Sequence, residues 1–64
     1  MERKYLVCFF HWTNNISSGF GDIIVTEGEN ENIYTPEELQ IVKNRIIDLN
    51  GYSGCSIQNI TPLN

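Results

Sequence analysis

The sequence holds few of the residues that staple a small protein together. Of its 64 residues only two are cysteine and one is histidine. Metal-stapled miniproteins need about four Cys or His ligands in paired spacing. Cys8 and His11 cannot share an ion on an extended strand, because their odd separation sends the side chains to opposite faces. The sequence therefore predicts no metal site and no cofactor.

A secretion signal and a membrane span are also missing. The apolar run Tyr5 to Phe10 follows basic residues, as in a signal peptide, but it stops at His11 without a small-residue cleavage site. No stretch approaches the roughly 20 apolar residues of a membrane span. We therefore expect a cytoplasmic protein. A disulfide between Cys8 and Cys55 is conceivable, but two reduced thiols are the commoner state in that compartment.

The length allows one domain, residues 1–64, with a thin core. A chain of this size buries only about 60% of the surface that its unfolded form exposes. Ordering the chain costs about 1.5 kcal/mol of entropy per residue, and the free energy gained by burying such a small core is about equal to that cost. Small chains usually gain the missing stability from disulfides, a metal or a second subunit. Since composition disfavours the first two, a second subunit is the expectation.

Basic residues are scarce: four Lys and Arg stand against eight Asp and Glu, a net charge of −4. A protein that follows a phosphate backbone needs a clustered basic stripe, so no nucleic-acid partner is expected. The acidic residues gather between positions 27 and 38. We interpret them as a solvated loop and helix start, with a basic partner as the alternative. They are Glu27, Glu29, Glu31, Glu37 and Glu38.

The order of local signals predicts an α+β fold of β-β-α-β type. Residues 4–12, 20–26 and 55–60 are rich in aromatic and β-branched types, as strands are. Their connections favour a three-stranded antiparallel sheet of order 2-1-3, with one helix packed on one face.

The helix start is the clearest local signal. Thr35-Pro36-Glu37-Glu38 has the form of a capping box, with Thr35 as N-cap and Pro36 at the first helical position. Tyr34 and Leu39 are placed to form a hydrophobic staple, and Asn50-Gly51 supplies a left-handed stop. Spacings of three and four predict a buried stripe, flanked by Ile47, and leave Ile41 exposed. The stripe consists of Leu39, Val42, Ile46 and Leu49.

A second apolar face appears when the first two strands are paired. If Trp12 pairs with Phe20, one face gathers residues for the helix to cover and the other remains open. Open sheet faces normally alternate with polar residues, and an uncovered apolar patch indicates a partner or subunit contact. The alternative is that residues 13–19 and 27–34 fold over this face, with Ile16 as a plug. The helix side comprises Val7, Phe9, Ile23, Val25, Cys55 and Ile57, and the open side Leu6, Cys8, Phe10, Trp12, Phe20 and Ile24.

Catalytic patterns are missing. His11 is the one histidine, placed beside an apolar run, and is more often a packed residue there than a base. The Gly19-Phe20-Gly21 motif opens a strand, whereas phosphate-binding glycine loops lead into a helix. Those glycines are better explained as turn geometry or as room for His11 or Trp12. We therefore do not expect an enzyme.

The sequence resembles small β-β-α-β proteins encoded by phages and prophages. The resemblance rests on the Lys-Tyr-Leu-Val opening, the Gly-Phe-Gly motif, the capped helix, Asn-Gly-Tyr and the closing Ile-Gln-Asn-Ile-Thr-Pro-Leu. The resemblance implies an accessory protein that occupies a host protein, including as an inhibitor of host defence. We expect a protein-binding module that forms a homodimer or binds a larger host protein. The alternative is a binder of a small, nucleotide-like molecule, enclosed between subunits or loops beside Trp12 and Phe20. The predicted partner-binding residues are Leu6, Phe10, Trp12, Phe20, Ile24 and Ile41.

Overall fold

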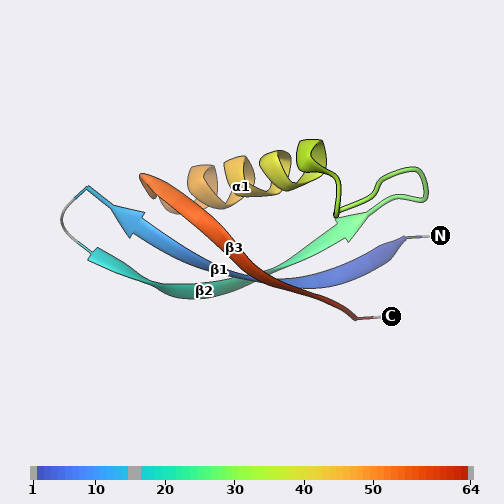
Figure 1. Cartoon of the computed structure of the whole chain (residues 1–64), viewed down its shortest axis with the longest axis horizontal. Coiled ribbons are helices and arrows are strands. Elements are labelled where there is room, and N and C mark those ends of the chain that lie inside the picture. Colours follow the sequence, from blue (N-terminus) through green and yellow to red (C-terminus); the bar gives the residue numbers. More distant parts are fainter. Residues whose placement is uncertain (1, 15–16, 64) are drawn as a thin grey trace.

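The computed structural model describes residues 2–14 and 17–63 of the chain. Four elements follow one another: β1 (Arg3–Thr13), β2 (Ser17–Glu27), α1 (Pro36–Asn50) and β3 (Gly54–Pro62). The strands form one antiparallel sheet of order β2-β1-β3. Helix α1 crosses one face of this sheet, and no element formed by the described residues covers the other face (Figure 1). The expected β-β-α-β fold is confirmed, although each strand extends beyond its predicted bounds.

Helix α1 begins and ends where the local signals predict. Thr35 has the extended backbone of an N-cap, and its Oγ1 accepts a hydrogen bond from the Glu38 backbone N–H at 3.3 Å. At the other end Gly51 has φ 71°, and its N–H donates to the Ile47 carbonyl at 2.8 Å. Only glycine adopts this left-handed conformation without a steric penalty. Both helix boundaries are therefore set by local chemistry.

The predicted register of the hairpin is wrong by two residues. Phe10, not Trp12, pairs with Phe20. Gly21 consequently lies opposite Phe9, and its missing side chain gives space to the ring, because a Cβ there would approach Phe9 Cζ to 2.9 Å. A slip of two residues leaves every side chain on the same face, since strand side chains alternate with period two. The predicted division of the hairpin into two faces therefore holds.

The hydrophobic core lies between the sheet and α1. Strand β3 has a bulge between the residues that pair with Cys8 and Phe9. Because of this bulge, Ile57 and Ile60 both pack against the core although they are an odd number of residues apart. One core residue, the fully buried Ile33, comes from the segment predicted as a polar loop. The buried hydrophobic residues are Tyr5, Val7, Phe9, Val25, Ile33, Val42, Ile46 and Cys55.

The predicted buried stripe of the helix is too long. Val42 and Ile46 are buried, but Leu49 is 67% exposed. Tyr52, which follows the helix, covers this end of the core instead. Its ring stacks on His11 at 4.1 Å between centroids and lies 6.3 Å from the Phe9 ring. Helical spacing alone does not show where a neighbouring segment already fills the space.

Candidate functional site

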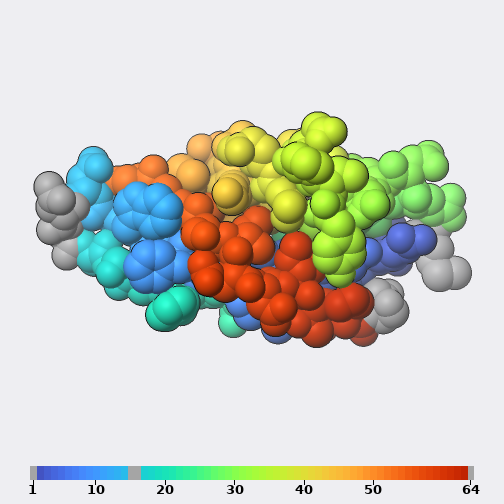
Figure 2. Space-filling model, in the orientation of Figure 1, coloured from blue at the N-terminus to red at the C-terminus, as the bar shows by residue number. Residues whose placement is uncertain are grey.

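The sheet face away from α1 carries a cluster of aromatic side chains. Phe10 is central: its ring centroid lies 5.2 Å from that of Phe20 and 6.0 Å from that of Trp12. Phe20 is 79% exposed, and Trp12 and Ile24 are exposed as well. Figure 2 shows side chains of β1 and β2, in blue and teal, toward the hairpin end of the molecule. Helix α1 does not cover them. We call this surface the open face; it consists of Leu6, Cys8, Phe10, Trp12, Phe20 and Ile24.

Strand β3 gives the open face a polar border. Ser56 lies opposite Phe10 in the β1–β3 pair, and Asn59 and Thr61 lie opposite Cys8 and Leu6. Hydroxyl and amide groups therefore edge the apolar patch along one side. An apolar centre with a polar rim is the usual composition of a protein interface.

The chain does not fold its second connector over the open face. Ile33 is buried in the core on the helix side, and the Tyr34 ring contacts Tyr5 edge-on at 6.0 Å. In the first connector, Thr13 and residues 17–19 belong to paired strands. Ile16, the predicted plug, lies outside the described residues. Within those residues, the alternative of a loop-covered face is not observed.

Ile41 does not join the other predicted contact residues. It is half exposed, as expected, but it projects from α1, which lies on the opposite side of the sheet. A single flat partner on the open face cannot reach it. Five of the six predicted residues therefore form one surface, and Ile41 is separate from it.

The two cysteines are free thiols on opposite faces of the sheet. Cys8 is half-buried on the open face, whereas Cys55 is buried under the helix with its Sγ 3.8 Å from the Lys43 carbonyl. A disulfide requires Cβ atoms about 3.8 Å apart, which this placement precludes. The expected reduced state agrees with the structure.

His11 lies opposite Cys55 in the β1–β3 pair, which raises the question of a nucleophile and its base. The His11 ring stacks on Tyr52, and its buried Nδ1 has no hydrogen-bond partner among the described residues. Burial raises the pKa of the Cys55 thiol, against a smaller lowering by the charge of Lys43. A raised pKa disfavours the thiolate that nucleophilic catalysis needs. His11 is thus packed against Tyr52, and Cys55 belongs to the hydrophobic core.

The structure corrects the expectation that the acidic stretch is fully solvated. Glu27 is only 4% exposed. Its carboxylate and those of Glu31 and Glu38 have oxygen atoms within 4.8 Å of one another. This acidic cluster joins the end of β2, the connector and the first turn of α1. Sequence reasoning missed it, although Glu27 has the strand parity of the inward-facing Val25.

Three causes raise the pKa of Glu27 from 4.5 to about 7. The largest is burial, followed by a side-chain hydrogen bond with Glu38 and then by the negative charges of Glu38 and Glu31. The positive charge of Arg45, on α1, lowers the pKa. Glu27 therefore resists ionisation near neutral pH.

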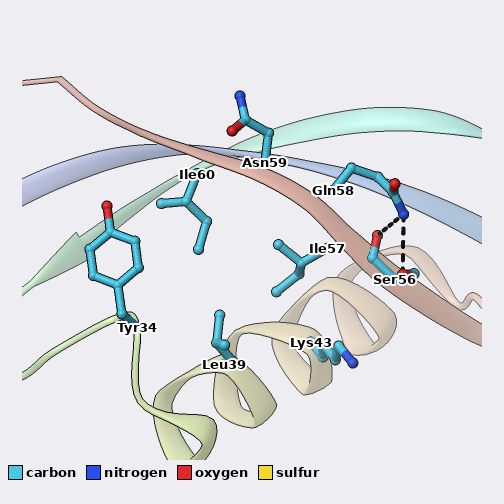
Figure 3. A pocket seen from close by; sticks show the side chains of 8 residues that line it. All are labelled: Tyr34, Leu39, Lys43, Ser56, Ile57, Gln58, Asn59 and Ile60. Atoms are coloured by element: carbon cyan, nitrogen blue, oxygen red, sulfur yellow. Dashed lines mark hydrogen bonds between the residues drawn. The ribbon is translucent and has the colours of Figure 1, made fainter.

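A groove of about 460 Å³ lies between α1 and β3. Leu39, Ile57 and Ile60 point into it, whereas Asn59 points to the other side of the sheet (Figure 3). It lies on the helix side, not beside Trp12 and Phe20, where the alternative hypothesis of a small-molecule binder placed the ligand. Its lining residues are Tyr34, Leu39, Lys43, Ser56, Ile57, Gln58, Asn59 and Ile60.

Within residues 2–14 and 17–63, no helix has the length and apolar content needed to cross a membrane. Comparison of the whole chain with protein families, with curated proteins and with solved structures gave no match.

Proposed function

We propose that the chain is a cytoplasmic, non-enzymatic protein-binding module that uses its open face to bind a second copy of itself. One observation carries the proposal. Phe20 stands 79% exposed beside Phe10 and Trp12 on a face that no other part of the described chain covers. Monomeric proteins rarely leave such a patch in water.

The energetics favour a protein partner. Burying the exposed part of one large apolar side chain stabilises a complex by roughly 2 to 3 kcal/mol, and aromatic residues are the commonest anchors of interfaces. Phe20 and Ile24 offer most of their surface for this purpose. The polar border on β3 can hydrogen-bond across the edge of a contact or remain in water.

Two features favour a second copy. The monomer has a thin core of eight buried hydrophobic residues and two free cysteines, so it gains stability from added burial. The chain carries a charge of −4, yet the charged residues within the open side of the strands are Lys4 and Asp22, of opposite sign. Two such faces therefore meet with little repulsion.

The test is the mass of the protein in solution over a wide range of concentration, measured by sedimentation equilibrium. Phe20→Glu places a charge on the patch beside Phe10 without touching the core, and it should give a folded monomer. Ile41→Glu makes the same change in charge on the opposite side and should leave the dimer intact. Trp12 is the one tryptophan, so its emission should shift to the blue as the wild type associates.

A wild type that stays monomeric, with Trp12 emission independent of concentration, would show that copies do not pair. The resemblance to phage and prophage proteins then favours a larger host protein as the partner, inhibited by occupation of the same face. Loss of that partner's binding in Phe20→Glu, and not in Ile41→Glu, is the matching test.

The groove between α1 and β3 favours a second candidate function, the binding of a small molecule. Its volume of about 460 Å³ is that of a ligand site, and Lys43 offers a positive charge beside Leu39 and Ile57. Native mass spectrometry of the purified protein checks for a retained ligand. Such a ligand should remain bound to Phe20→Glu, because the groove and the open face lie on different sides of the sheet.

A further inference from the structure

The acidic cluster has the construction of a ligand site. Glu27 ends β2, Glu31 lies in the connector and Glu38 lies in the first turn of α1. The connector turns between Gly28 and Glu31, and two hydrogen bonds hold the turn. The Glu31 N–H donates to the Gly28 carbonyl at 3.1 Å, and the Gly28 N–H donates to Glu31 Oε1. The chain thereby holds three carboxylates within 4.8 Å of one another despite their repulsion.

Glu27 is the group that calls for a ligand. It is 96% buried, and its Oε1 is a buried atom with no hydrogen-bond partner among the described residues. Glu27 shares a side-chain hydrogen bond with Glu38, but a buried carboxylate oxygen that lacks a donor or a cation is costly. Arg45 lowers the pKa of Glu27 through its charge, but it donates no hydrogen bond to the buried oxygen. A positive charge among the three carboxylates would satisfy all of them together.

We propose that Glu27, Glu31 and Glu38 bind one divalent cation of the hard, oxygen-preferring class, with Ca²⁺ as the best fit. The donor atoms are carboxylate oxygens, without the thiolate or imidazole that favour zinc. Ca²⁺ with bonds of 2.3 to 2.6 Å spans oxygens up to about 5 Å apart, whereas Mg²⁺ with bonds of 2.0 to 2.1 Å spans only about 4.2 Å. Oxygens that all lie within 4.8 Å of one another fall within the reach of Ca²⁺ without any rearrangement of the site.

The exposed side of the site suits Ca²⁺ as well. Glu31 is exposed and Glu38 is half-buried, so water can complete the six to eight ligands that this ion takes. The bound ion would tie the end of β2 to the start of α1 across the connector, at the end of the molecule opposite the hairpin turn (Figure 1). It would thus stabilise the fold independently of any partner on the open face.

Calorimetric titration with Ca²⁺, and separately with Mg²⁺, tests the site at about pH 8, where the carboxylates are ionised. The wild type should bind one Ca²⁺ with a dissociation constant on the order of 10⁻⁴ M, in the range of weak protein sites. Mg²⁺ should bind at least about tenfold more weakly. Equal affinity for the two ions would overturn the choice of Ca²⁺.

Glu31→Gln is the informative variant, because Glu31 is exposed and its substitution leaves the hydrophobic core intact. It should weaken Ca²⁺ binding about tenfold or more, and its urea midpoint should no longer rise with Ca²⁺. Glu37→Gln makes the same change in charge at an exposed neighbour outside the cluster and should keep the wild-type affinity within about twofold.

Two results would overturn the proposal. One is the absence of saturable binding by the wild type up to about 10 mM Ca²⁺, well above the constants of weak sites. The other is an equal loss of affinity in Glu31→Gln and Glu37→Gln, which would reduce the effect to general attraction by an acidic surface.

Discussion

The buried Glu27 should make the metal-free protein less stable as pH rises. Its folded-state pKa of about 7 lies above the ordinary value of 4.5, so between these values the folded chain holds a proton that the unfolded chain has lost. The stabilising proton is fully present below about pH 4.5 and is lost as pH rises through about 7. The charged groups that face Glu27 are Glu38 and Arg45 from α1 and Glu31 from the connector.

The magnitude follows from the size of the shift. About 2.5 pKa units at 1.36 kcal/mol each give roughly 3 kcal/mol of stability lost between about pH 4.5 and about pH 8. Glu27 is almost fully buried, so solvent screens this interaction little. For a domain whose total stability is small, such a loss is large.

The assay is urea unfolding with a chelator present, at about pH 5 and about pH 8. Glu27→Gln keeps the shape of the side chain and removes the charge, so it should be more stable than the wild type at the higher pH and nearly flat between the two. Glu37→Gln, exposed on the same helix turn, should keep the wild-type slope. If the wild type is as stable at about pH 8 as at about pH 5, or if Glu27→Gln retains the full slope, the account of Glu27 is wrong.

Three further outcomes are expected. Thr35→Ala removes the acceptor of the Glu38 N–H and should lower the free energy of unfolding by about 1 kcal/mol in urea titrations; coincident midpoints would contradict the capping. Alkylation followed by mass spectrometry should modify two thiols in denatured, unreduced protein, and in the native protein Cys8 should react before the buried Cys55. Phe9→Ala empties the core beneath α1 and should cost about 3 to 5 kcal/mol, so circular dichroism should show a largely unfolded chain.

Much of the fold was predictable because its signals are local. The bounds of α1 rest on Thr35 and Gly51, whose chemistry acts within one helical turn. The two sheet faces rest on the period of two, which survives an error in register. The register itself was not predictable from parity, because slips of zero and two residues give the same faces. The fit of the Phe9 ring over Gly21 is the signal that distinguishes them.

The candidate sites divide in the same way. The open face followed from the alternation along two strands, so all six of its residues were found from the sequence. The acidic cluster was missed because residues 27–34 look like a solvated loop by composition. Ile33, buried in the core, holds that connector against the sheet. One apolar residue among polar neighbours gives no sign from the sequence that it will anchor the segment.

The length of β2 separates the open face from the acidic cluster. Phe20 and Glu27 are seven residues apart on this strand, which is roughly 20 Å along an extended chain, and they face opposite sides of the sheet. Sites at this distance, with no shared contact, usually contribute additively to free energy. Phe20→Glu and Glu31→Gln in one chain should therefore change stability by the sum of their separate effects. By the same reasoning, occupancy of one site should not alter affinity at the other. The two sites should therefore be energetically independent, with no allosteric coupling through the strand.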